Sequence, residues 1–127
     1  MIAFALQKEL DAGRPYAEVA VEVIRPFVGG AISDTDLSRM AREAYGTFRH
    51  PAVVPIAQFG ASTFLLELFH GPTMAFKDVG ARVQARLLHH FTDGTPLTIL
   101  VATSGDTGSA VAQSFHRVPD TRVVVLY

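Results

Sequence analysis

Hydrophobic positions recur every three or four residues in the first part of the chain, and this spacing predicts helices. We expect one helix over residues 2–11 and a second that begins at Pro15 and is ended early by Pro26. A third helix should be capped by Ser33 or Thr35. Glycines predict the breaks between and after these helices, at positions 13, 29, 30 and 46. The expected inward positions of the third helix are Leu37, Met40, Ala41, Ala44 and Tyr45.

After residue 50 the pattern changes, and short apolar runs alternate with stretches of helical spacing. The run 53–56 holds Pro55 and is at most an edge strand, whereas FGAS (59–62) is turn-like. We expect Asp78 to cap a helix that Asp93-Gly94 ends. Three further strands are expected: buried strands over 64–69 and 97–102, and an apolar strand over 122–126. They alternate with expected helices over 78–91 and 107–116.

This order predicts the α/β class: a βαβαβ unit with parallel strands over residues 51–127, preceded by a small helical segment over residues 1–50. In such a unit every loop from a strand to a helix lies at the carboxyl edge of the sheet. The loops 70–77 and 103–107 are both of this kind. We therefore expect them to face the same crevice.

Composition narrows the class of protein. The 127 residues are 49% hydrophobic, enough for one compact core, and the formal net charge of −1 gives no broad basic surface for nucleic acid. No apolar stretch is long enough to span a membrane, and the first residues lack a signal peptide. The chain has no cysteine, and its histidines lack metal-ligand spacing with carboxylates, so no metal site is expected. A cytoplasmic location is the default expectation.

The loop ATSGDTG, residues 102–108, combines glycines and hydroxyls at the start of a helix. The first N–H groups of a helix are unpaired, and its dipole favours an anion, so a carboxylate or phosphate is a natural guest. A plain helix-capping turn uses the same residue types. The loop is neither a P-loop, nor a nucleophile elbow, nor a GxGxxG motif. From the residues alone, both interpretations stay open.

Lys77 is one of only two lysines in the chain, and it stands between Phe76 and Asp78 at the start of an expected helix. A cation is disfavoured at that end of a helix. The ordinary interpretation is a solvated lysine whose charge Asp78 offsets in part. The alternative is an amine whose neutral form is favoured beside Met74 and Phe76, which makes it a usable nucleophile for carbonyl compounds.

Two long motifs carry a resemblance to a known family. LELFHGPTMAFKDVGAR (66–82) closely resembles the cofactor-lysine segment of threonine synthases, and ATSGDTGSAVA (102–112) resembles their substrate loop. The similarity extends over most of 16–127. It implies a PLP (pyridoxal 5'-phosphate) enzyme of fold type II, the tryptophan-synthase-β type. Such a lyase converts O-phospho-L-homoserine and water to L-threonine and phosphate.

The resemblance also implies roles for individual residues. Lys77 would be the internal aldimine lysine and the proton shuttle, with the cofactor ring as electron sink. Phe76 would pack beside the ring, and Asp106 would lie near its 3-hydroxyl. Residues of the second loop would hold the substrate carboxylate, and two further residues would lie near its phosphate. The loop residues are Thr103, Ser104, Gly105, Thr107 and Gly108, and the two near the phosphate are Thr73 and Arg82.

The chain departs from the family in length. Family members have several hundred residues, and their loop for the cofactor phosphate would lie beyond Tyr127. The chain therefore resembles a fragment that lacks its C-terminal portion, and we expect it to bind PLP weakly and to make no threonine on its own. One alternative is another fold-type-II enzyme, of the threonine dehydratase or cysteine synthase type, which the HGPT-x-AFKD segment disfavours. Another is a non-catalytic binding or assembly module that retains the motifs.

Overall fold

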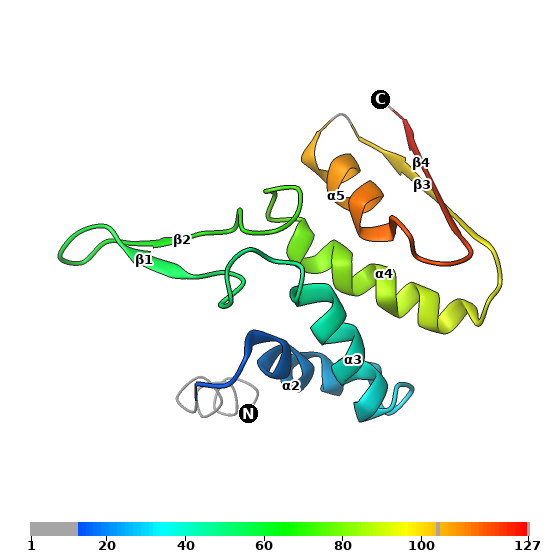
Figure 1. Ribbon diagram of the computed structural model, residues 1–127, viewed down its shortest axis with the longest axis horizontal. Coiled ribbons are helices and arrows are strands. Elements are labelled where there is room, and N and C mark those ends of the chain that lie inside the picture. Colours follow the sequence, from blue (N-terminus) through cyan, green and yellow to red (C-terminus); the bar gives the residue numbers. More distant parts are fainter. Residues whose placement is uncertain (1–12, 104, 127) are drawn as a thin grey trace. The chain divides into compact units, whose positions relative to one another are not determined.

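The computed structural model describes residues 13–103 and 105–126, which fall into two compact units divided between Gly46 and Thr47 (Figure 1). The helix expected over 2–11 and the predicted site residue Ser104 lie outside the described residues. The predicted domain boundary at residue 50 stays a prediction, because a compact unit is not by itself a domain. Each unit is described separately below.

The first unit is a pair of packed helices, α2 (Tyr16–Val28) and α3 (Asp34–Tyr45). Ser33 caps α3, because its hydroxyl accepts a hydrogen bond from the Asp36 N–H at 3.1 Å. Gly29 ends α2 in the left-handed conformation, with a φ of 54°. The prediction that Pro26 ends α2 early is wrong. Proline lacks an N–H and its ring crowds the carbonyl four residues earlier, but both effects fall in the last turn of the helix, which continues to Val28.

The core of the first unit confirms the helical pattern read from the sequence. All five predicted inward positions of α3 are buried, and Leu37, Met40 and Ala41 are each 1% exposed. The ring of Tyr45 meets that of Tyr16 edge to face, with 4.8 Å between the ring centroids. The remaining buried hydrophobic residues of this unit are Ala20, Val21 and Ile32.

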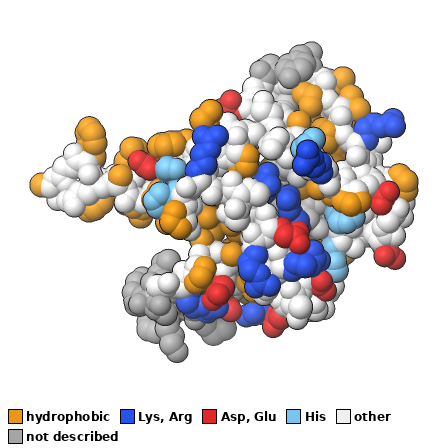
Figure 2. Space-filling model, viewed as in Figure 1, with side chains coloured by type: hydrophobic (Ala, Val, Ile, Leu, Met, Phe, Trp, Pro, Cys, Tyr) orange, Lys and Arg blue, Asp and Glu red, His pale blue; other side chains and the backbone are white. Residues whose placement is uncertain are grey.

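The second unit begins with a two-stranded antiparallel hairpin, β1 (Ile56–Gln58) and β2 (Phe64–Leu66). This corrects two predictions. The strand expected over 53–56 starts only at Ile56, since Val53 has a φ of 61° and cannot lie in a strand. The segment 64–69, expected to be a buried parallel strand, turns back after FGAS and pairs with its own predecessor. Figure 2 shows hydrophobic side chains on this hairpin, where all of β2 is exposed.

A parallel sheet follows, as the α/β pattern predicts. β3 (Leu97–Ala102) and β4 (Thr121–Leu126) pair in parallel, and α5 (Asp106–Phe115) connects them. α5 packs on both strands, and α4 (Asp78–Thr92) packs against α5 (Figure 1). The parallel part of the described chain is therefore one βαβ unit with a further helix, because β2 does not join this sheet.

The strands of the parallel sheet are half exposed, which corrects the expectation that 97–102 is buried. Exposure alternates along both β3 and β4, and Leu100 is 66% exposed. The alternation follows from the strand period of two, since α5 contacts one face of the sheet. In the part of the chain that the structure describes, no helix is long and apolar enough to cross a membrane.

Helix α4 ends as expected at Asp93 and Gly94, both of which have positive φ. It begins differently from the prediction. Asp78 is the first residue of the helix and Lys77 occupies the capping position. The Asp78 side chain is wholly buried and bonds to the preceding loop, so it does not act as the cap.

Gly108 allows the close approach of α5 to the sheet. A Cβ atom at this position would lie 2.9 Å from Cγ2 of Thr103 and 3.2 Å from Cγ1 of Val125. Both neighbours are β-branched side chains on a paired backbone, so neither can easily move aside. Gly80, by contrast, has open space where its Cβ would stand.

We predict that Gly108→Ala lowers the free energy of unfolding by about 1–2 kcal/mol, because overpacking outweighs the gain in helix propensity. The matched control, Gly80→Ala, receives the same propensity gain of up to ~1 kcal/mol without a clash. Urea denaturation of both variants measures the difference. Equal stability of the two variants would contradict the close approach.

A second prediction concerns the tyrosine pair. Burial raises the pKa of Tyr45, as does the neighbouring Tyr16, and burial also raises the pKa of Tyr16. The folded chain therefore keeps these protons at pH values where the unfolded chain has lost them, so stability must fall as the pH rises past the ordinary tyrosine value of about 10. Denaturation from about pH 8 to about pH 11 measures this loss. Tyr45→Phe should flatten the dependence, and an unchanged slope would contradict it.

Candidate functional site

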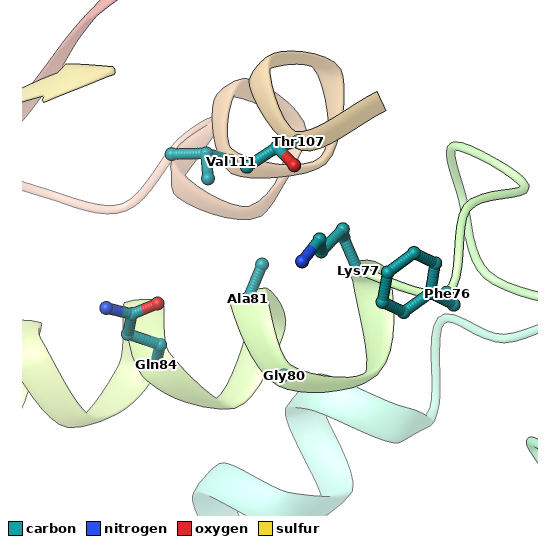
Figure 3. A pocket seen from close by; sticks show the side chains of 7 residues that line it. All are labelled: Phe76, Lys77, Gly80, Ala81, Gln84, Thr107 and Val111. Atoms are coloured by element: carbon teal, nitrogen blue, oxygen red, sulfur yellow. The ribbon is translucent and has the colours of Figure 1, made fainter. Parts of the chain in front are cut away.

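An open pocket of about 370 Å³ lies between α4 and α5 in the second unit. One amine, one hydroxyl and one carboxamide face it, among otherwise small or apolar groups. Figure 3 shows the Lys77 side chain extending into the hollow, with Ala81 of α4 beneath it and Thr107 of α5 opposite. The lining residues are Phe76, Lys77, Gly80, Ala81, Gln84, Thr107 and Val111.

Lys77 is placed as an exposed amine above an aromatic ring. Its Nζ lies 4.6 Å from the centroid of the Phe76 ring, within the range of a cation–π interaction. Its carbonyl accepts a hydrogen bond from the Ala81 N–H at 2.9 Å, which ties its backbone into the first turn of α4. The amine is therefore accessible from the pocket, while its backbone is held.

Lys77 and the second loop do come together, but not for the predicted reason. The prediction assumed that 64–69 and 97–102 are neighbours in one parallel sheet, whereas β2 belongs to the hairpin. The two segments meet because α4 packs along α5, so that the first turns of both helices border the pocket. Thr107 is the residue of the second loop that lines it.

The other described residues of the second loop lie in or beside the first turn of α5 and do not line the pocket. The Thr103 N–H donates to the Leu126 carbonyl at 3.0 Å, and its hydroxyl accepts from the Gly105 N–H at 3.4 Å. Asp106 is the exposed first residue of α5, and Gly108 is buried against the sheet. Their predicted roles toward cofactor and substrate stay predictions.

The loop before Lys77 is held by a buried carboxylate. Oδ2 of Asp78 accepts the backbone N–H of Thr73, and Oδ1 accepts the Thr73 hydroxyl, both at 2.8 Å. Asp78 is 0% exposed. Within the loop, Met74 has a φ of 59° and donates its N–H to the Gly71 carbonyl at 3.1 Å. Both hydrogen-bond donors of Thr73 are thus occupied by one side chain.

Arg82 lies on a different face of α4 from Lys77. It is 6% exposed, and its pKa is lowered mainly by burial and further by Arg86, while Asp78 acts in the opposite direction. Arg86 donates to the carbonyls of Arg82 and of Ser114, at 3.2 and 3.1 Å. Neither Thr73 nor Arg82 lines the pocket, so their expected place near a leaving phosphate stays a prediction.

Four lining residues were not identified from the sequence. Ala81 and Gln84 stand four and seven positions after Lys77, which is the helical spacing of one face, and this signal could have revealed them. Gly80, three positions after Lys77, and Val111, four positions after Thr107, follow the same helical spacing. Among residues 13–103 and 105–126, no group of three or more histidine, aspartate or glutamate side chains could hold a metal ion.

Comparisons with known proteins agree on one family. No family model matches the chain. The threonine synthase of Pseudomonas aeruginosa is 44% identical over 117 residues, 91% of this chain, and that of Escherichia coli is 44% identical over 108 residues. A crystal structure described as PLP-bound threonine synthase from Brucella melitensis superposes with a TM-score of 0.85 at 50% identity over 89% of this chain. The Escherichia coli structure has a TM-score of 0.82 at 38% identity.

The match covers one part of those proteins. The chain spans 25% of the Pseudomonas aeruginosa sequence and 25% of the Brucella melitensis structure. Within that span, both the sequence and the arrangement of helices and strands agree. The chain is thus homologous to one segment, about a quarter in length, of the threonine synthases, and it has the fold of that segment.

Proposed function

We propose that the chain forms the cofactor-lysine portion of a threonine synthase, a PLP-dependent lyase that converts O-phospho-L-homoserine and water to L-threonine and phosphate. One observation carries the proposal: within a segment 44% identical to a threonine synthase, Lys77 projects into the pocket between α4 and α5. A cytoplasmic location and a requirement for the remaining portion of the enzyme belong to the same proposal.

The residues present fit the reactive part of the cofactor. An aldehyde needs a primary amine within reach, and Lys77 offers one on the pocket wall. The planar ring needs a wall that leaves it room, which Gly80 and Ala81 provide, and the Phe76 ring adds an aromatic surface beside them. When bound, PLP supplies an electron sink for the carbanion formed at the substrate Cα.

The chain's own groups then have distinct tasks. Lys77 Nζ holds the cofactor and, once released, takes the proton from the substrate Cα. The first turn of α5 presents N–H groups and the Thr107 hydroxyl beside the pocket, which suits the substrate carboxylate. Phe76 lies under the amine and limits its approach to one side.

The alternatives receive less support. Threonine dehydratases and cysteine synthases share the fold type, but the named relatives are threonine synthases, at up to 50% identity. A non-catalytic module would have no need to keep an exposed lysine over an aromatic ring beside a helix start. No separate structural observation favours it.

We predict that PLP followed by borohydride labels Lys77 and largely spares Lys8, because Lys77 lines a pocket that can hold the cofactor. Peptide mass mapping measures both sites in one sample. Lys77→Ala should abolish the specific label, whereas Lys8→Arg should leave it unchanged. Equal labelling of the two lysines would show nonspecific amine chemistry and would refute the proposal.

We also predict that the 127-residue chain alone binds PLP weakly and releases no measurable phosphate from O-phospho-L-homoserine. The chain spans a quarter of the length of the Pseudomonas aeruginosa threonine synthase, so about three quarters of that protein have no counterpart in it. A phosphate-release assay with saturating PLP tests this. Sustained turnover, lost in Lys77→Ala, would contradict it.

A further inference from the structure

Helix α4 begins with two stripes of side chains on different faces. Lys77, Ala81 and Gln84, at four- and seven-residue spacing, line the pocket. Asp78, Arg82 and Ala85, shifted by one position, are buried. Neighbouring residues of a helix point about 100° apart, so the rotation of α4 about its axis decides where Lys77 points. Whatever holds the buried stripe therefore also directs the amine.

The Asp78 carboxylate attaches the buried stripe to the preceding loop by polar contacts. It accepts two hydrogen bonds from Thr73, and the Asp78 N–H donates to the Ala75 carbonyl at 3.0 Å. These bonds join the first residue of α4 to the loop that precedes Lys77. They close a short ring of chain, of which Phe76 and Lys77 are the last residues before the helix.

The loop is built around this carboxylate. A Cβ atom at Gly71 would overlap the Asp78 side chain, so only glycine leaves room for it there. Met74 adopts a positive φ, which a residue other than glycine accepts only at a cost in free energy. The cost is offset when the fold fixes the turn, and the two hydrogen bonds from Thr73 to Asp78 fix it on both sides.

We propose that Asp78 is a positioning residue for the cofactor lysine: through Thr73 it fixes the loop and the rotation of α4, so that Lys77 stands over Phe76 in the pocket. The inference rests on the proposed function of Lys77. The same inference gives Thr73 a role in holding the loop, in place of the expected hydrogen bond to the leaving phosphate. An ionised carboxylate only accepts, so both Thr73 donors are used within the loop, and its hydroxyl oxygen retains only acceptor capacity.

The test compares the ratio of Lys77 to Lys8 labelling by PLP and borohydride in four variants of the 127-residue chain. Thr73→Val removes the hydroxyl at nearly constant volume, and Thr73→Ser restores it. Asp78→Asn retains the shape but leaves one acceptor oxygen in place of two. Thr121→Val is the matched control, because it removes a hydroxyl bond of the same 2.8 Å length, to the Val118 carbonyl, far along the chain from the loop. Circular dichroism verifies that each variant is folded at the labelling temperature.

We expect the ratio to fall about five- to tenfold in Thr73→Val and Asp78→Asn, the equivalent of one hydrogen bond, and to recover in Thr73→Ser. Thr121→Val should leave it unchanged. A ratio preserved in both Thr73→Val and Asp78→Asn, or an equal fall in Thr121→Val, overturns the positioning role. Equal labelling of Lys77 and Lys8 in the unaltered chain would instead reject the proposed function, and with it this inference.

Discussion

The packing of α4 against α5 is the contact on which the candidate site depends. Lys77 and Thr107 are thirty positions apart in the chain, and each stands in or just before the first turn of its helix. Only when the helices lie together do these turns border one pocket. Small buried residues stand on both helices, Ala81 and Ala85 on α4 and Ala110 on α5. At Ala81, which lines the pocket, a larger side chain would fill the space beside the amine.

A second constraint is electrostatic. A carboxylate taken wholly out of water is stable only when its oxygens are hydrogen-bonded or paired with charge. Asp78 satisfies this with both donors of Thr73, while the buried Arg82 lies one turn further along α4. If the loop moved away, the buried Asp78 carboxylate would therefore lose the hydrogen bonds from Thr73 that compensate its burial. The loop held in this way directly precedes Lys77, the exposed amine of the pocket.

The apolar surface of the second unit has a different character from its pocket. Phe59 is 82% exposed and Phe64 is 62% exposed on the hairpin, and Leu100 is 66% exposed on β3. Within the described residues, the hairpin pairs only with itself, and α5 packs on the parallel sheet. Such exposed side chains add little to the stability of the unit, whose core lies instead along α4, α5 and the loop before Lys77.

Local sequence determined the helices, caps and strand bounds that depend only on neighbouring residues. The α3 pattern, its Ser33 cap, the Asp93-Gly94 stop and the bounds of β3 were all predictable, because each depends on residues within one or two turns. The two motifs likewise indicated the threonine synthases, to one segment of which the chain is homologous. The pairing of strands and the burial of side chains were not predictable, since they depend on which distant segments of the chain pack together. Thus 64–69, with a strand-like composition, became half of an exposed hairpin rather than a buried parallel strand. Asp78 has the residue type of a helix cap, yet tertiary structure turned its carboxylate inward to Thr73, because a loop with glycine at position 71 left room for it.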